Sequence, residues 1–441
     1  MQTAKPLTLA LLVLASAACH RDAQPPTPAV ATATATATVD LAKPWSVHDW
    51  PLPSTTGSGQ PDLAVTPDGR VMLSWISSLP GRRKALQFVA MADNGHWYSA
   101  PRTIAVGNSL MANWANVPHI AQTADGALWV QFMQQHGEGH AGDVALSRST
   151  DGGFNWSAPI AVNDDGVEAE HGFAALWPAT RDSIGVAWLN GGESGDKGMQ
   201  HGGPGMADGE GMHHGEGRTG LHAAVFDMNL QRNDETVLDP KTCDCCQSEI
   251  VATSRGPLLA YRDRSDEEVR DIAVVRNDGK TWGKPVPVHA DGWVMPGCPV
   301  NGPSLAADRD NVVVAWYTAA NDKPLVQAAR STDAGDSFAA PVVLEQGAAV
   351  QGRAAVALDA RQAFVLWIRE DANGQSLWLS RRSPDLAREL QRIEVAKLQG
   401  RGRATGYPQV ALRNGEAYIA WTDIVDGAPQ LRGAVLTPAG G

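Results

Sequence analysis

The sequence lacks a basic patch, and this excludes the partners that a basic patch would attract. Its 36 Lys and Arg residues are outnumbered by 48 Asp and Glu residues, so the formal net charge at pH 7 is −12. Nucleic acids and anionic lipid surfaces are negatively charged and have no electrostatic attraction to such a chain. We therefore expect no nucleic-acid partner, and contact with a membrane only through a covalent lipid anchor.

Helix-favouring amphipathic runs are also scarce, whereas residues typical of turns are abundant. The chain has 45 Gly and 28 Pro, and its 15 Trp outnumber its 7 Phe and 5 Tyr together. A length of 441 residues could hold two or three ordinary domains or one large all-β unit. The composition favours the second, with many short strands joined by turns.

The N-terminal segment predicts export from the cell. Lys5 is the only basic residue before the apolar stretch 7–15, and Ser16-Ala17-Ala18 precede Cys19. This resembles a bacterial lipoprotein signal, which implies a signal peptide over 1–18 and lipidation of Cys19. A plain signal peptide cleaved nearby is the alternative. By the same resemblance, His20 after Cys19 implies the periplasmic face of the outer membrane, or the cell surface.

The stretch 19–43 that follows the signal is Pro-rich and then alternates Ala and Thr. Such a composition cannot bury enough apolar surface to fold, so we expect an unfolded tether. Residues 44–441 then form the folded part, which we expect to be a single domain and a monomer.

An apolar strand ending in an aromatic residue recurs through the folded part. Its seven aromatic positions are Trp75, Phe132, Trp188, Tyr261, Trp316, Trp367 and Trp421. Most copies lie among other short strands and turns, so each repeat reads as a four-stranded antiparallel sheet. This predicts an all-β fold, a β-propeller of seven blades by repeat count, with six possible. The last repeat has three strands of its own, and residues 45–52 could supply its outer strand.

A second motif occurs in register with the repeat and identifies a family. Two segments fit Ser-x-Asp-x-Gly-x-x-aromatic: Ser149, Asp151, Gly153 and Trp156 in one, and Ser331, Asp333, Gly335 and Phe338 in the other. The Asp can accept backbone N–H bonds in a tight turn, and Gly supplies the positive φ. These residues match the Asp-box, so the chain resembles the sialidase, or BNR/Asp-box, superfamily. The Asp-boxes themselves are expected to be structural.

Propeller topology places the unusual residues of the chain on one face. Asp-boxes occupy the turn between strands three and four, which lies at one end of a blade. The His/Met-rich insertion 193–218 falls in the two-three loop of the third blade, at the other end. The cysteines fall in the links into blades four and five, at that same end, and three histidines in neighbouring segments join them: His136, His140 and His171.

Four cysteines outside the signal form the first candidate site: Cys243, Cys245, Cys246 and Cys298. Two disulfides are one expectation for an exported protein, with Cys243 or Cys246 joined to Cys298. Complete pairing is awkward, however, because Cys245 and Cys246 are neighbours and a bond between neighbours is strained. Ligation of a metal by the thiolates is the other expectation.

The insertion supplies a second set of soft ligands: Met199, His201, Met206, Met212, His213 and His214. Thioether, imidazole and thiolate are ligands that copper and zinc select. A solvated insertion without function is the alternative, although three Met in a Gly-rich tract are unusual. The tract is similar to those of exported copper-handling proteins, and a flexible loop suits capture and transfer of Cu(I).

The resemblance to sialidases implies a different site. Sialidases grip the substrate carboxylate with three arginines and use a Tyr nucleophile, and an Arg-Ile-Pro motif marks their first blade. This chain has no Arg-Ile-Pro; the corresponding region contains Arg82. Candidate residues for such a site are Arg82, Arg262, Arg264, Arg353, Arg403, Tyr261 and Tyr407. The segment 261–270 reads equally well as a charged loop whose residues pair with one another.

The sequence thus leads to one main hypothesis and two alternatives. The main hypothesis is an exported propeller lipoprotein that binds a soft metal, copper first and zinc second, for storage, handling or resistance. Another exported metal-handling protein is then an expected partner. The alternatives are an exo-α-sialidase-type glycoside hydrolase and a non-catalytic propeller that binds a glycan or a protein.

Overall fold

The computed structural model describes five stretches of the chain, namely residues 43–92, 95–135, 141–192, 218–233 and 235–439. Contacts divide the chain into two units, 1–40 and 41–441. The first unit, with the predicted signal peptide 1–18 and Cys19, lies outside the described residues. So do most of the predicted tether, His136, His140 and the insertion residues 193–217.

The described residues form seven four-stranded antiparallel sheets. The first three blades are built from β2 (Ser58–Val65), β3 (Val71–Ser78), β4 (Lys84–Ala90) and β5 (Arg102–Gly107); β6 (His119–Gln122), β7 (Leu128–Gln135), β8 (Gly142–Ser149) and β9 (Ile160–Ala161); and β10 (Gly172–Pro178), β11 (Ile184–Asn190), β12 (Gly220–Phe226) and β13 (Thr236–Asp239).

Blades four to six continue the same order: β14 (Glu249–Thr253), β15 (Gly256–Arg262), β16 (Ile272–Arg276) and β17 (Val286–His289); β18 (Ser304–Asp308), β19 (Asn311–Thr318), β20 (Leu325–Ser331) and β21 (Val342–Gln346); and β22 (Val350–Leu358), β23 (Ala363–Asp371), β24 (Gly374–Arg382) and β25 (Glu389–Leu398). Blade seven combines β26 (Gln409–Arg413), β27 (Glu416–Val425) and β28 (Ala428–Pro438) with β1 (Trp45–Asp49).

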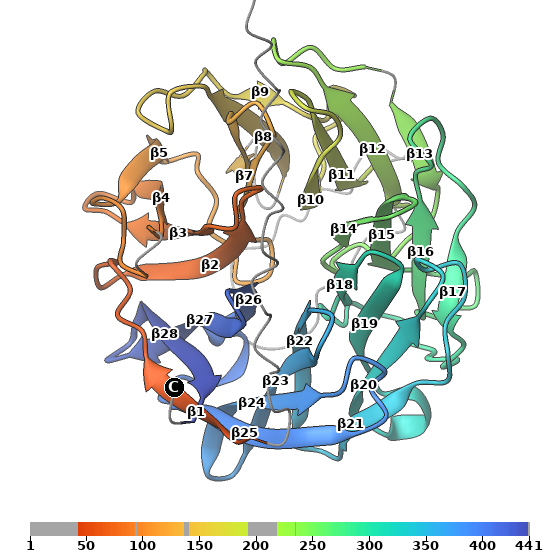
Figure 1. Ribbon diagram of the computed structural model, residues 1–441. Coiled ribbons are helices and arrows are strands. Elements are labelled where there is room, and N and C mark those ends of the chain that lie inside the picture. The colour runs from red at the N-terminus through yellow and green to blue at the C-terminus, as the bar shows by residue number, and fades with distance from the viewer. Residues whose placement is uncertain (1–42, 93–94, 136–140, 193–217, 234, 440–441) are drawn as a thin grey trace, which may run out of the picture. The chain divides into compact units, whose positions relative to one another are not determined.

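The seven sheets stand in a ring around a central axis, with the first strand of each blade innermost (Figure 1). Each innermost strand contacts the innermost strand of the next blade, and β26 contacts β2, which closes the ring. Within the described stretches the helices are two short 3-10 turns, η1 (Ala320–Asp322) and η2 (Gly402–Thr405). None of the helices found there is long and apolar enough to span a lipid bilayer. The predicted seven-bladed, sialidase-like all-β propeller is confirmed.

The aromatic repeat is confirmed as the internal core of the blades. All seven positions lie in the second strand of a blade, and none is more than 7% exposed. A large ring at this position packs between adjacent sheets, where it removes apolar surface from water. The aromatic residue therefore recurs once per blade because each pair of neighbouring sheets needs a large apolar side chain between them.

The Asp-box turns occupy the predicted connection between strands three and four. Asp151 Oδ1 accepts N–H bonds from Phe154 at 3.0 Å and Asn155 at 2.9 Å, and Gly153 N donates to Ser149 Oγ at 2.9 Å. The N–H of Asn155, together with the other donors of the turn, lowers the pKa of Asp151 to about 2. Gly153 has φ of +87°, and a Cβ there would collide with the ring of Phe88. The motif is structural, as predicted.

The ring closes by pairing the two ends of the folded part. β1 pairs antiparallel with β28, from Trp45 opposite Pro438 to Asp49 opposite Ala434. The ring of Trp45 lies 5.1 Å from that of Phe364 in blade six. The outer strand that the seventh repeat lacks is therefore supplied by the N-terminal part of the domain, as the sequence predicted.

Candidate functional site

The four cysteines outside the signal meet on the face opposite the Asp-boxes. Cys243, Cys245 and Cys246 lie in the link from β13 to β14, and Cys298 lies in the link from β17 to β18. We call these four residues the sulfur cluster. Cys243 is held by a backbone bond from its N–H to Arg262 O at 3.1 Å. Two links that are distant in sequence thus bring their sulfur atoms together, as the topology predicted.

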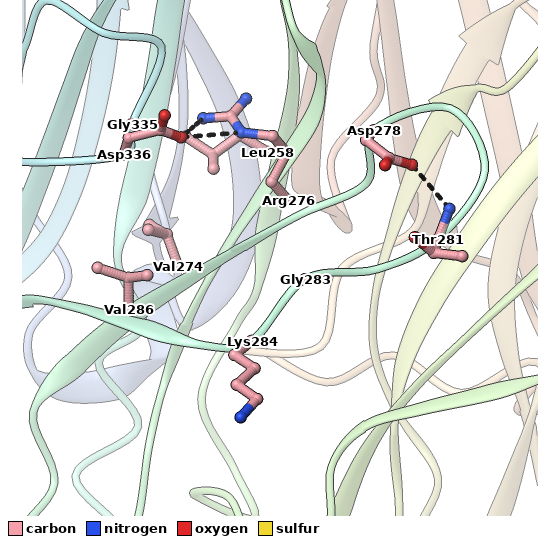
Figure 2. A pocket seen from close by; sticks show the side chains of 10 residues that line it. All are labelled: Leu258, Val274, Arg276, Asp278, Thr281, Gly283, Lys284, Val286, Gly335 and Asp336. Atoms are coloured by element: carbon pink, nitrogen blue, oxygen red, sulfur yellow. Dashed lines mark hydrogen bonds and ion pairs between the residues drawn. The ribbon is translucent and has the colours of Figure 1, made fainter.

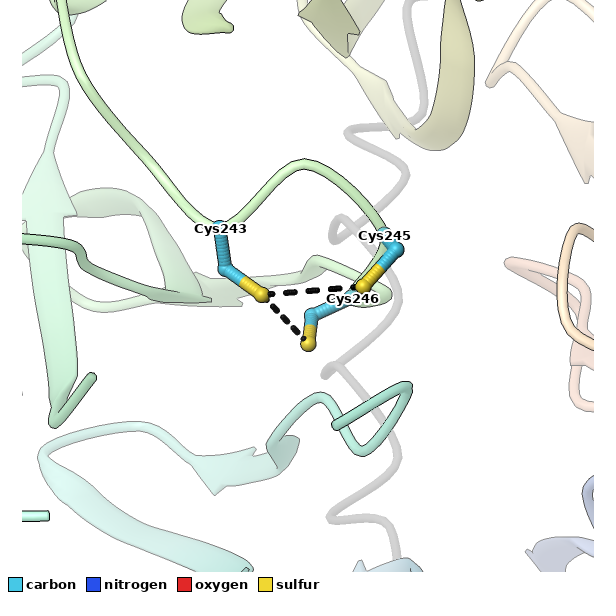
Figure 3. Close-up of side chains that lie close together, drawn as sticks. All are labelled: Cys243, Cys245 and Cys246. Carbon is cyan, nitrogen blue, oxygen red and sulfur yellow. Dashed lines mark hydrogen bonds between the residues drawn. The ribbon is translucent and has the colours of Figure 1, made fainter. Parts of the chain in front are cut away.

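The sulfur cluster contains one disulfide and two free thiols. Cys245 is bonded to Cys298, with their Cα atoms 6.1 Å apart, while Cys243 and Cys246 are free and buried. Cys243 Sγ lies 2.8 Å from Cys246 Sγ and 3.9 Å from Cys245 Sγ (Figure 3). The expected pairing of Cys298 with Cys243 or Cys246 is wrong, because the Cys243 side chain turns towards Cys246 instead.

Apolar side chains surround the sulfur atoms on the inner side. The cluster packs with Ala115, Phe173, Val300 and Tyr407, and Cys243 is only 1% exposed. Water is thereby largely excluded from the thiols. A buried thiolate in such a setting needs a compensating positive charge.

Arg270 supplies that charge from the segment before β16. Its guanidinium is 2% exposed and donates from Nη1 to Cys243 Sγ at 3.3 Å and to Asp244 Oδ1 at 3.1 Å. It also donates to Met295 O at 2.9 Å and to Glu268. These partners hold the guanidinium firmly against the sulfur. Arg270 was not among the residues predicted for this site; its place in the self-paired segment 261–270 was the available signal.

The surroundings of the two free thiols shift their pKa values in opposite directions. Burial raises the pKa of Cys243, but the hydrogen bond from Cys246 and the charges of Arg270 and Arg262 outweigh it, so the pKa falls to about 7. Burial, with the hydrogen bond and charge of Cys243, raises the pKa of Cys246 well above its ordinary value. Cys243 is therefore the more readily ionised thiol, and a thiolate is the form that binds metal.

Two arginines of the predicted sialidase site, Arg262 and Arg353, have their hydrogen-bond donors largely occupied. Arg262 Nη2 donates to Asn301 O and to Tyr317 O, each at 2.7 Å. Arg353 Nη1 donates to Thr405 Oγ1 and to Gly406 O, each at 3.0 Å. Both guanidinium groups therefore brace the links between blades.

The remaining candidates for that site are only partly brought together. Tyr407 stacks on Trp114 at 6.1 Å, and the guanidinium groups of Arg353 and Arg403 lie 6.0 and 5.8 Å from the Trp114 ring. The hydroxyl of Tyr407 donates to Val300 O at 2.5 Å, and burial raises its pKa. Deprotonation of Tyr407 is thus disfavoured.

The other three sialidase candidates have separate surroundings. Arg264 pairs with Glu268 at 2.7 Å within the segment 261–270, whereas Tyr261 donates outside it, to Asp239 Oδ2 at 2.6 Å. Arg82 lies in the exposed turn between β3 and β4. His171, predicted on the face opposite the Asp-boxes, is buried and bonds through Nδ1 to Asn190 Oδ1 at 3.0 Å.

A polar group on the innermost strands was not predicted from the sequence. His119 Nδ1 lies 2.9 Å from Asp62 Oδ1, and Glu249 Oε2 accepts the N–H of Leu305 at 2.8 Å. Burial lowers the pKa of His119, but the Asp62 carboxylate outweighs it and raises that pKa. Asp62 and His119 each follow a proline at the start of a blade, and this recurring Pro-polar pair was the available signal.

Glu249 is expected to make stability depend on pH. Burial raises the pKa of its carboxyl group from 4.5 to about 7, so between these values the folded protein holds a proton that the unfolded chain has released. The free energy of unfolding therefore falls as the pH rises through this window. Glu249→Gln should flatten this part of the curve, as measured by denaturant unfolding across the pH range. The exposed Glu394→Gln is the control, and parallel curves for Glu249→Gln and wild type would contradict the assignment.

A pocket of about 270 Å³ lies on the Asp-box face, between blades four and five (Figure 2). Two of its charged side chains pair with each other, Arg276 Nη2 with Asp336 Oδ1 at 3.2 Å. Arg276 also donates to Thr253 Oγ1 at 3.0 Å. These contacts tie blade four to the Asp-box of blade five, so we assign this pocket a structural origin and place the candidate chemistry at the sulfur cluster.

Comparisons with known proteins support the fold and leave the activity open. No family model and no curated protein matches the chain. A protein of unknown function from Dyadobacter fermentans has a TM-score of 0.50 at 14% identity, covering 89% of this chain and 99% of that chain. This likeness concerns the propeller fold alone.

Two structures of named enzymes are similar at lower scores. A Penicillium chrysogenum α-L-arabinanase has a TM-score of 0.46 at 10% identity, covering 86% of this chain and 93% of its own. The NanB sialidase of Streptococcus pneumoniae has a TM-score of 0.44 at 11% identity, covering 88% and 70%. Neither likeness transfers a substrate to this chain.

Proposed function

We propose that this protein binds a soft metal ion, Cu(I) first and zinc second, at the sulfur cluster. The observation that carries the proposal is the meeting of four cysteine sulfurs from two separate links in a buried, apolar setting. Thiolates select Cu(I) and zinc over hard cations such as Mg²⁺ and Ca²⁺. Cys243 and Cys246 are the ligands available when the Cys245–Cys298 disulfide is intact, and all four are available in the reduced protein.

The distances within the sulfur cluster are close to those that a metal requires. With a metal–sulfur bond of about 2.3 Å, two thiolates on one ion lie roughly 3.8 to 4.6 Å apart, depending on the angle at the metal. Cys243 Sγ and Cys245 Sγ are 3.9 Å apart, a separation that fits a metal only once the Cys245–Cys298 disulfide is reduced, whereas Cys243 Sγ and Cys246 Sγ are 2.8 Å apart. The second pair would have to separate by about 1 Å. A change of this size is within reach of side-chain rotation.

The charges around the sulfur cluster suit an anionic metal–thiolate group. Several thiolates on one Cu(I) carry a net negative charge, which is costly to bury without a counter-charge. Arg270 and Arg262 are 2% and 1% exposed, and both lower the pKa of Cys243. The site thus combines soft ligands with two fixed positive charges.

A backbone contact beside the His/Met-rich insertion supports a role for the insertion at this site. The residues from Met199 to His214 lie outside the described stretches, but Thr219 on their C-terminal flank accepts the N–H of Thr242 at 2.8 Å. Thr242 immediately precedes Cys243. We propose that the insertion captures the ion and passes it to the cysteines, in an exported protein anchored through Cys19 that receives the metal from, or delivers it to, another exported protein.

A competition titration tests this function. The purified, reduced protein is expected to withdraw Cu(I) from a coloured chelator under anaerobic conditions, at a stoichiometry near one ion per chain. A variant lacking residues 199–214 should retain this affinity but accept the ion more slowly. No withdrawal of Cu(I) by the reduced wild type would refute the proposal.

A carbohydrate-directed activity is the second candidate, favoured by one observation. Arg353 and Arg403 flank Trp114 on the face opposite the Asp-boxes, and the exposed Arg403 beside this aromatic ring can bind a carboxylated sugar, with the buried Arg353 supporting the ring. Release of a fluorescent group from a sialoside, reduced in Arg353→Ala and Arg403→Ala, would support it. Absence of release, or release indifferent to both changes, would remove it.

A further inference from the structure

We infer that Cys243 and Cys246 form a reversible redox-active dithiol whose oxidation state decides whether the sulfur cluster accepts a soft metal ion. The first part, the redox pair, stands on the geometry of the sulfurs. The second part, the gating of metal, rests on the proposed function. The Cys245–Cys298 disulfide is assigned a different, structural role.

The separation of the two free thiols places them close to bond formation. Cys243 Sγ and Cys246 Sγ are 2.8 Å apart, and a disulfide bond is about 2.05 Å long. Metal binding would require the opposite movement, to roughly 3.8 Å or more. The same two sulfurs therefore cannot be bonded to each other and ligate a metal together, so oxidation and metal binding exclude each other.

The two cysteine pairs differ in what they hold together. Cys245 and Cys298 are 53 residues apart and join the link into blade four to the link into blade five. A bond across so long a loop restricts the unfolded chain and stabilises the fold. Cys243 and Cys246 are separated by two residues of one link, so their bond closes a very short loop. Reduction of the Cys243–Cys246 bond leaves the two blades joined by the Cys245–Cys298 disulfide. The Cys243–Cys246 pair can therefore alternate between its reduced and oxidised forms without loss of the fold.

The surroundings of the pair favour small reagents over protein partners. Cys243 and Cys246 are 1% and 2% exposed. Arg270 Nη1 donates to Cys243 Sγ at 3.3 Å. It also donates to Oδ1 of Asp244, the next residue in the chain, at 3.1 Å. With so little exposed surface a macromolecular thiol cannot reach either sulfur directly, so we take a small disulfide as the reagent.

The reaction is an exchange with a small disulfide, written R–S–S–R. The Cys243 thiolate attacks one sulfur and forms a mixed disulfide, releasing one R–S⁻; Cys246, having lost its proton to solvent, then attacks Cys243 Sγ and releases the second R–S⁻. Two protein thiols are oxidised to one disulfide, and the reagent is reduced to two thiols. Excess small thiol reverses both steps.

Two double variants separate the pairs in a redox titration. The full chain is equilibrated in glutathione buffers of graded ratio, quenched with acid, alkylated, and its thiols counted by intact mass. Cys245→Ser/Cys298→Ser, which keeps the proposed pair besides Cys19, should gain and lose two thiols together within the range of buffers. Cys243→Ser/Cys246→Ser, which keeps the structural pair besides Cys19, should keep that pair oxidised throughout. If the first variant does not fold, differential alkylation and peptide mapping of the wild type give the same assignment.

The results that overturn the inference are specific. If Cys243 and Cys246 stay reduced in the most oxidising buffer, no redox pair exists. If they stay oxidised in the most reducing buffer that leaves the fold intact, the pair is a second structural disulfide.

Gating is tested on the same samples with Cu(I) held by a coloured chelator. The protein with Cys243 and Cys246 oxidised is expected to bind Cu(I) at least tenfold more weakly than the protein with both reduced. Equal binding in the two states overturns the gating. A clear redox step with no Cu(I) binding in either state would refute the proposed function while leaving the redox pair established.

Discussion

Replacing Cys243 and Cys246 together by serine is expected to weaken Cu(I) binding by the reduced protein more than about 100-fold. Loss of a single outer partner of a metal ligand already costs about 10–100-fold in affinity, and this change removes two ligands. Serine keeps the size of the side chains and the fold, since neither sulfur joins the blades. Chelator competition under anaerobic conditions measures the change.

A thioether far from the sulfur cluster provides the control for this prediction. Met228 is 51% exposed and follows β12, at the end of the blade where the Asp-boxes lie. Met228→Leu should leave the affinity for Cu(I) unchanged. If Cys243→Ser/Cys246→Ser binds as tightly as wild type, the metal is held elsewhere, and the histidines and methionines of the insertion become the candidates.

Removing β1 is expected to have the largest effect on the fold. Trp45 is 4% exposed and belongs to this strand, and truncation of a buried Trp alone costs about 3–5 kcal/mol. Loss of the whole strand also leaves β28 as an unpaired edge, which favours association with other chains. The protein without residues 45–49 should melt at a markedly lower temperature and associate, as followed by circular dichroism and size-exclusion chromatography.

The conservative change Trp45→Phe tests whether β1 stabilises the protein mainly through its pairing with β28 or through the Trp45 ring. It keeps β1 paired with β28 and retains an aromatic contact with Phe364. We expect a smaller loss of stability than on deletion and no association. An unchanged melting temperature on deletion of 45–49 would show that the ring closes without this strand.

The fold could be predicted from the sequence because each blade has the same packing requirement. The second strand of each blade must place one large apolar residue between neighbouring sheets. Trp75 in blade one and Trp421 in blade seven therefore occupy the same position. The Asp-box fixes a turn through local hydrogen bonds, which depend only on residues close in sequence. The outer strand of blade seven was predictable because three strands leave an open edge.

The pairing of the sulfurs could not be read from the sequence in the same way. Topology brings the cysteine links to one face, but which sulfur meets which depends on side-chain direction within the link. Cys245 reaches Cys298, and Cys243 turns towards Cys246 and Arg270. From the sequence, complete disulfide pairing was not expected because Cys245 and Cys246 are neighbours. In the structure these two residues point to different partners, so both can be paired without a bond between neighbours.

The arginines were uncertain for a related reason. A guanidinium group in a loop can face a ligand or the backbone of a neighbouring blade, and the residue type does not distinguish these cases. The guanidinium N–H groups of Arg262 and Arg353 donate to backbone carbonyl groups of neighbouring segments. Few of these N–H groups remain for a substrate. Seven blades meeting at an axis create many such carbonyl groups, and buried carbonyl groups require donors.

X-ray absorption at the copper edge, on the reduced protein loaded with one Cu(I) per chain, tests the central claim most directly. The account predicts sulfur neighbours around the copper, near the metal–thiolate distance of about 2.3 Å, and their loss in Cys243→Ser/Cys246→Ser. A first shell of nitrogen or oxygen alone in the wild type, or a spectrum unchanged by that double substitution, would contradict it.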